Sequence, residues 1–167
     1  MYEKSIELFN KAVADELYAV HQYMYFHFHC EDQGYELLSS LFFRTAIEEM
    51  QHIERCAERI IFLGSDVDMI AAEEVKKIHD VQEMLKLASD MERQSARDYN
   101  LWANECSANA DAGSRKVFEG LVEDEERHFD QYDTEMANIK KFGERYLALQ
   151  SIEGSKNMAA GGAPAQP

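Results

Sequence analysis

Two short stretches of the chain, EEMQH at residues 48–52 and DEERH at residues 124–128, carry the same Glu-x-x-His spacing. Residues three apart lie on one face of an α-helix, so each unit would present a carboxylate and an imidazole in the same direction. These two ligand types suit divalent iron or manganese. A single Glu-x-x-His unit is common and means little alone, but the repeat predicts two helix-borne ligand pairs: Glu49 with His52, and Glu125 with His128.

Two more glutamates complete a symmetric pattern. Glu16 precedes Glu49 by the same number of positions as Glu92 precedes Glu125. The separation between Glu16 and Glu92 is also the separation between Glu49 and Glu125 and between His52 and His128. We call this common separation along the sequence the repeat interval. It indicates two copies of one helical hairpin related by a pseudo-two-fold axis. All of these residues fall within apolar helical stripes, where a charge without a partner would be costly to bury.

The pattern matches the ligand set of a two-metal site inside a helix bundle. Ferritin-like di-iron and di-manganese proteins use one Glu from each of two helices and a Glu-x-x-His unit from each of the other two. Four carboxylates also balance the charge of two divalent cations, and zinc would fit but has no redox chemistry. The alternative is a solvated or salt-bridged cluster, which does not require matched spacing. The predicted ligands are Glu16, Glu49, His52, Glu92, Glu125 and His128.

Helical periodicity predicts the elements that would position these residues. Apolar residues recur at steps of three and four over residues 3–30, 37–63, 80–108 and 115–142, and Gly64 is a natural helix end. Short turns make the first and second helices antiparallel, and also the third and fourth. The connection between the second and third helices can reach about 55 Å, more than the length of about 42 Å of such a helix. We therefore predict an all-α, ferritin-like four-helix bundle with one long crossover and a short fifth C-terminal helix.

Composition narrows the class of protein further. The length of 167 residues suffices for one domain, expected over residues 1–152, while residues 153–167 have the low complexity of a disordered tail. A formal net charge of −15 argues against nucleic acid or an anionic membrane as partner and fits a protein that gathers cations. No stretch approaches the roughly 20 apolar residues that a membrane span needs. The three widely separated cysteines favour a reducing compartment, so we expect a cytoplasmic protein.

With these motifs the sequence resembles the bacterioferritins of the ferritin superfamily over about residues 1–152. The matching stretches are ADELYAVHQY, EEMQHIERCAERIIFLG and DEERHFDQYDTEM. The resemblance implies a ferroxidase centre that oxidises Fe(II) to Fe(III) with dioxygen or hydrogen peroxide. Glu49 and Glu125 would bridge two iron ions. Each iron would have two further ligands, one of the two outer glutamates, Glu16 and Glu92, and one of the two histidines. Tyr23, two helical turns after Glu16, would lie beside the centre as an electron donor; a core aromatic packed against a carboxylate is the alternative.

Met50 is the residue that most distinguishes this family. It follows Glu49 by one position and therefore points about 100° round the helix, away from the centre. A methionine here in bacterioferritins ligates haem shared by two subunits, and a thioether suits haem iron. The resemblance implies a haem bound through Met50 at a dimer interface, although a methionine that only packs such an interface is the alternative. Residues that would line the haem pocket are Leu17, Val20, His21 and Met24.

The same resemblance implies an assembly and its partners. Twenty-four copies, built from dimers, would form a hollow shell around a ferric mineral, and a ferredoxin-type reductant would release the iron. Cys56 and Gln131 depart from the family, which often has aromatic residues at these positions, so aromatic routes for electrons are in doubt. The pattern assigns no role to Trp102.

Three other functions fit the sequence less well. A rubrerythrin-like di-iron peroxidase or oxidase without mineral storage is the main alternative, but the chain lacks a Cys-x-x-Cys domain for electron delivery. A helical scaffold would have no reason to bury six ionisable residues. Mini-ferritins of the starved-cell DNA-binding type place their ligands between subunits and lack the doubled Glu-x-x-His unit.

Overall fold

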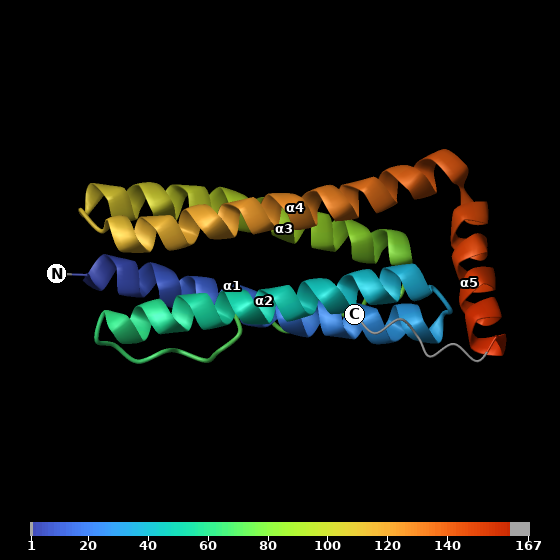
Figure 1. The fold of residues 1–167 in the computed structure, drawn as a ribbon, viewed down its shortest axis with the longest axis horizontal. Helices are drawn as coiled ribbons and strands as arrows, with labels where there is room; N and C mark the ends of the chain where they lie inside the picture. Colours follow the sequence, from blue (N-terminus) through green and yellow to red (C-terminus); the bar gives the residue numbers. More distant parts are fainter. Residues whose placement is uncertain (1, 161–167) are drawn as a thin grey trace.

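The structure is a computed structural model that describes residues 2–160, apart from the side chain of Met158. Four long helices lie along a common axis, and a shorter helix crosses one end of the bundle (Figure 1). The helices are α1 (Glu3–Asp32), α2 (Glu36–Phe62), α3 (Val81–Ala108), α4 (Ala112–Phe142) and α5 (Glu144–Ala159). This confirms the predicted all-α four-helix bundle with one long crossover and a short fifth helix.

Local sequence signals explain where the ligand-bearing helices begin and end. Asp80 caps α3, because its carboxylate accepts hydrogen bonds at 3.0 Å from two backbone N–H groups of the first turn. Asp111 caps α4 in the same way through the N–H of Ser114 at 3.1 Å. Gly64, the predicted end of the second helix, follows α2 with a φ of +85°, a conformation that glycine adopts without strain.

The apolar core is divided into two clusters by the predicted metal ligands. In α1, Glu16 lies between Val13, which belongs to one cluster, and Ala19, which belongs to the other. In each of the other three helices the ligands likewise lie between residues of one cluster and residues of the other. The ionisable residues therefore form a polar layer across the middle of the bundle, with apolar packing on both sides that excludes water.

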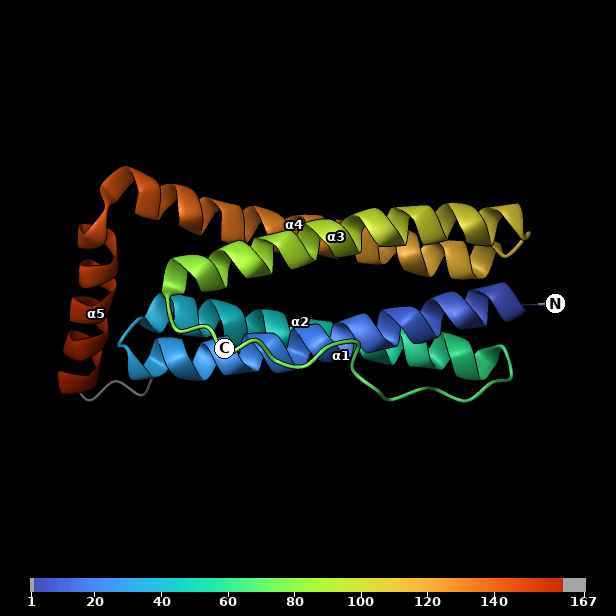
Figure 2. The ribbon, with the colours of Figure 1, turned by 180° about the vertical axis from the view of Figure 1, so that it is seen from behind.

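The crossover between α2 and α3 runs along α1 (Figure 2). Its backbone is fixed to that helix by hydrogen bonds: the N–H of Asp68 donates to the Asn10 side chain, and the N–H of Ala72 donates to the Ala14 carbonyl, both at 2.9 Å. Val67 packs against the apolar cluster at this end of the bundle. The crossover therefore covers one surface of the α1/α2 pair.

The fifth helix is longer than composition indicated. Residues 153–159 were expected to lie in a disordered tail, but α5 continues through Ala159. Gly154 is buried, and a Cβ atom added to it would lie 2.8 Å from a carboxylate oxygen of Glu36, so α5 approaches the first turn of α2 closely at this residue. Residues 161–167, which also belong to that expected tail, lie outside the described residues. Within the described chain, no helix has the length and apolar character needed to span a membrane.

Candidate metal centre

All the predicted ligands meet in the polar layer. Their ligand atoms form two overlapping groups, and within each group every atom lies within 4.8 Å of the others. None of these residues is more than 2% exposed. Glu49 and Glu125 belong to both groups and so lie where bridging ligands would lie. The complete groups are Glu16, Glu49, His52 and Glu125, and Glu49, Glu92, Glu125 and His128.

The two histidines point their Nδ1 atoms at the shared carboxylates. His52 Nδ1 lies 2.7 Å from one oxygen of Glu49 and 3.0 Å from an oxygen of Glu125. His128 Nδ1 lies 3.0 Å from the other oxygen of Glu49. Although these contacts are within ion-pair distance, neither Nδ1 atom and neither Glu49 oxygen has a hydrogen bond of acceptable geometry. Buried polar atoms are rarely left without a partner, so this set fits cations held between imidazoles and carboxylates.

When no cation is bound, these groups must share protons. Burial and the nearby Glu49 carboxylate raise the pKa of Glu16 to about 8, and the same two causes raise the pKa of Glu125 well above its usual value. Burial also disfavours ionised Glu49, but close polar contacts with the two histidines outweigh it and lower the Glu49 pKa to about 2. Burial disfavours protonated His128, yet its contacts with two glutamates raise its pKa to about 11. The pKa of His52 is raised by its carboxylate neighbours in the same way, against the effect of burial.

Metal loading is therefore expected to release protons. Near pH 7 the four groups with raised pKa values hold protons unless a cation replaces them, because metal ligands must be deprotonated. Calorimetric titration with redox-inactive Zn²⁺, in two buffers of different ionisation enthalpy, should show release of up to four protons per chain. The apparent affinity should rise as the pH is increased toward 8. A proton count near zero would contradict the shared-proton cluster.

Two buried tyrosines hold the outer glutamates, and sequence patterns identified only one of them. The hydroxyl of Tyr23 donates a hydrogen bond to Glu92, and the hydroxyl of Tyr99 donates one to Glu16 at 2.6 Å. Each tyrosine thus orients a glutamate from the other half of the chain. Tyr99 follows Tyr23 by the repeat interval that relates the ligands, so this interval contained the missing signal.

Replacing Tyr99 by phenylalanine should weaken metal binding on the Glu16 side. The ring would still pack, but Glu16 would lose the hydroxyl that orients it, and such supports contribute roughly 10–100-fold to metal affinity. Co²⁺ titration followed by visible absorption should show that one of two metal positions has weakened. Tyr132→Phe is the matched control, because the Tyr132 hydroxyl is buried without a hydrogen-bond partner. Equal Co²⁺ affinities in the two variants would remove this role from Tyr99.

Carboxylates lie behind both histidines. His128 Nε2 is 2.7 Å from Glu48, and His52 Nε2 is 3.3 Å from Asp124. These contacts leave both Nδ1 atoms for the centre, as is usual for metal-bound histidines. Arg127 joins the two carboxylates through hydrogen bonds of 2.7 Å and 3.0 Å. Glu48 and Asp124 are also separated by the repeat interval, and each directly precedes a shared glutamate. The interval therefore indicated these two carboxylates as well, although the sequence analysis gave them no role.

The remaining sequence candidates lie outside this layer. Met50 is 52% exposed on the outer side of α2, as its position predicted. Cys56 is buried one turn after His52 and provides no aromatic ring there. On the same side of the centre, however, the Trp102 ring lies 5.4 Å from the ring of Tyr99, measured between centroids. An aromatic contact therefore extends outward from the Glu16 side in spite of the cysteine.

Known proteins match this fold over most of the chain. The family model for the ferritin-like domain matches residues 6–142. The bacterioferritin of Desulfovibrio desulfuricans is 34% identical over 145 residues, covering 87% of this chain and 81% of the relative. That of Brucella melitensis is 31% identical over 149 residues, with coverages of 89% and 92%. An X-ray structure of the Desulfovibrio desulfuricans protein, which shows its diiron site in different catalytic states, matches with a TM-score of 0.86 at 33% identity and covers 88% of this chain and 86% of that one.

The fold and the polar layer together define a ferritin-like helix bundle with a candidate two-metal centre in its core. The matches to bacterioferritins cover most of the chain at more than 30% sequence identity, so within the ferritin-like proteins this chain belongs to the bacterioferritins.

Proposed function

We propose that this protein oxidises Fe(II) to Fe(III) at the centre in the polar layer and stores the ferric product as a mineral inside a shell of 24 copies. Dioxygen or hydrogen peroxide would accept the electrons. The observation that carries this proposal is the pair of overlapping ligand groups that share Glu49 and Glu125. Two shared carboxylates bring two cations close together, so that one oxidant can take an electron from each.

The residues would have distinct roles. Glu49 and Glu125 would bridge the two iron ions. The outer ligands would be Glu16 with His52 for one iron, and Glu92 with His128 for the other. The bound iron supplies the redox chemistry: two Fe(II) ions yield two electrons, which with two protons reduce dioxygen to hydrogen peroxide, or hydrogen peroxide to two water molecules. Four carboxylates balance two divalent cations but not two trivalent ones, which favours transfer of the ferric product toward the cavity.

Tyr23 would contribute to the same step. Its buried hydroxyl donates to Glu92, so the phenol can pass a proton to that carboxylate when it gives up an electron. This would supply one electron beyond the two that iron provides. Orientation of Glu92 is the second effect of the same hydrogen bond.

We further propose that Met50 binds haem together with the same residue of a second copy. The side chain is half exposed and faces away from the centre, beside the exposed Ile47. On α1, Leu17, Val20 and Met24 are half-buried, so they could form an apolar wall, whereas His21 is exposed. Met50 supplies one thioether per chain, so two axial ligands from this position would require a dimer. Haem would carry electrons from a ferredoxin-type reductant to the stored iron, and a cytoplasmic location would keep the three free, buried cysteines reduced.

Iron retention tests the storage proposal directly. Apo-protein is loaded aerobically with a large excess of Fe(II) and desalted, and iron per chain is measured together with particle mass by light scattering. Many irons per chain on a shell-sized particle are expected. About two irons per chain on a small particle would leave the di-iron centre but remove storage, in favour of a rubrerythrin-like redox enzyme.

A further inference from the structure

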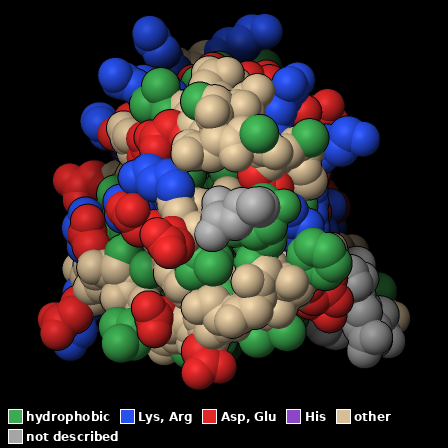
Figure 3. All heavy atoms as spheres, turned by 90° about the vertical axis from the view of Figure 1, so that its left-hand side faces the viewer, with side chains coloured by type: hydrophobic (Ala, Val, Ile, Leu, Met, Phe, Trp, Pro, Cys, Tyr) green, Lys and Arg blue, Asp and Glu red, His purple; other side chains and the backbone are tan. Residues whose placement is uncertain are grey.

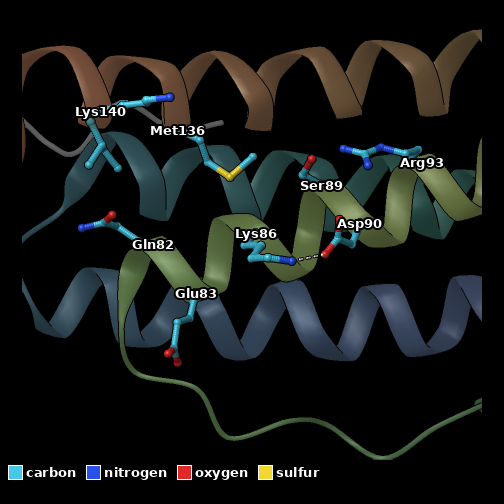
Figure 4. Close-up of a pocket in the computed structure, with 9 residues that line it drawn as sticks. Gln82, Glu83, Lys86, Ser89, Asp90, Arg93, Met136 and Lys140 are labelled. Atoms are coloured by element: carbon cyan, nitrogen blue, oxygen red, sulfur yellow. Dashed lines mark hydrogen bonds and ion pairs between the residues drawn. The ribbon is translucent and has the colours of Figure 1, made fainter.

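The α3/α4 pair carries an open groove of about 650 Å³, lined by the first half of α3 and the last turns of α4 (Figure 4). Its position places it near the end of the bundle that α5 crosses (Figure 1). The volume is within the range of sites that hold drug-sized ligands, so the groove has room for a few residues of a peptide. None of the metal-centre residues lines it, so it requires a separate explanation.

The internal repeat shows what covers the corresponding surface in the other half. Asn10 and Ala14, which accept hydrogen bonds from the crossover backbone, stand one repeat interval before Lys86 and Asp90. Both of these later residues line the groove. On the opposite wall, Met136 is the counterpart of Ile60. The groove therefore corresponds to the surface on which an extended segment lies in the first half of the chain.

The groove also contains a polar group that lacks a partner. Ser89 is 1% exposed, and its hydroxyl has no hydrogen-bond partner among the described residues. Figure 4 shows this hydroxyl on the side of α3 that faces α4. Met136 and Ile139 supply an apolar wall beside it. An unpaired buried hydroxyl next to an apolar wall favours an occupant with both a hydrogen-bonding group and an apolar side chain.

Charge indicates the chemistry of that occupant. Lys86, Arg93 and Lys140 line the groove, and their counterparts one repeat interval earlier are all uncharged. Two carboxylates, Glu83 and Asp90, also line it, but Asp90 is paired with Lys86 at 2.7 Å. Arg93 and Lys140 form no ion pair with any residue that the structure describes. At the opposite end of the molecule, basic and acidic side chains are mixed over the surface (Figure 3). Within the groove, the two basic residues without an ion pair favour an acidic partner.

We propose that this groove binds an acidic, extended segment of a second copy of this chain. The chain already covers the equivalent surface with such a segment: the first part of its crossover, GSDVDMIAAEE at residues 64–74, has four acidic residues and no basic one. With a net charge of −15, a second copy is a ready source of acidic segments. Contact between a groove on one copy and a different surface on the next is heterologous, and such contacts close into rings and shells.

The proposed docking rests on the proposed shell but not on the metal centre. Reversing two rim charges, Lys86→Glu with Lys140→Glu, should raise the protein concentration at half-dissociation of the assembly by about tenfold or more, because like charges across a contact oppose association. Lys11→Glu with Lys116→Glu is the matched control, since it makes the same change in net charge at exposed residues near the other end of the bundle. Sedimentation velocity across a dilution series measures the effect. Zn²⁺ binding by the groove variant should equal wild type, which separates failure of assembly from failure of the centre.

Zero-length carbodiimide cross-linking identifies the occupant in the wild-type assembly. Mixing ¹⁴N- and ¹⁵N-labelled copies distinguishes links between copies from links within one copy. Lys86 or Lys140 should be joined to an Asp or Glu of another copy, and the link should be lost in the groove variant. Links only within one copy, a link only to a different protein, or a groove variant that assembles as wild type does would each overturn the proposal.

Discussion

Replacing Glu49 by glutamine is expected to abolish rapid Fe(II) oxidation, with a loss on the order of 100-fold or more in the initial rate. Glutamine keeps the shape of the side chain and removes its charge. Glu49 is shared by both ligand groups, and its pKa is lowered to about 2. Glu49 is therefore already ionised and available to a metal at neutral pH. Loss of this one charge should disturb both cations, whereas loss of an outer ligand would disturb one.

The Glu49→Gln variant can be examined without any turnover. Zn²⁺ should bind with a stoichiometry of fewer than two per chain, and the rise in melting temperature that bound metal gives the wild type should largely disappear. The metal-free variant should be less stable than metal-free wild type at neutral pH, because ionised Glu49 lies between two protonated histidines and its loss leaves their buried positive charge without this partner. Glu58→Gln, an exposed glutamate on the same helix, is the matched control. Wild-type oxidation rates together with two bound Zn²⁺ in Glu49→Gln would exclude Glu49 as the bridging ligand.

Helical periodicity predicted the fold and the convergence of the ligands because both depend mainly on spacing within the chain. Glu49 and His52 share one helical face whatever the bundle geometry is, and the repeat interval places the matching positions at one level of two hairpins. The structure confirms the fold, with the ends of the four long helices within three residues of the predicted ones. It also brings the predicted ligands into one layer.

Contacts between the two halves were harder to predict. Tyr99 reaches Glu16, and Asp124 reaches His52, only because the hairpins pack face to face. A single-helix pattern does not record which side chains meet across that interface. The repeat interval does record candidates, since Tyr99 repeats Tyr23 and Asp124 repeats Glu48. The length of α5 is a different case, because local composition disfavours a helix over residues 153–159 and does not record that α5 lies against α2.

Replacing Met50 by leucine is expected to eliminate haem binding and to leave Fe(II) oxidation largely intact. The two side chains are similar in volume, so packing at a dimer surface should change little, but leucine offers no sulfur to haem iron. Apo-protein reconstituted with haem should show the absorption bands of a bis-thioether complex for wild type and no protein-bound porphyrin for Met50→Leu. Met69→Leu is the matched control, because Met69 is also an exposed methionine, at 61% against 52% for Met50, and lies on the crossover.

The two functions should separate because Met50 and Glu49 point in different directions from the same helical turn. Glu49 is fully buried in the polar layer, whereas Met50 lies on the outer side of α2. Loss of haem should therefore slow the reductive release of stored iron and not its uptake. Release is measured with a ferrous chelator and a chemical reductant that donates electrons to haem. If Met50→Leu retained bound haem with the wild-type spectrum, the axial ligand would be another residue; if it bound no haem but lost rapid oxidation as well, the two sites would be coupled through α2.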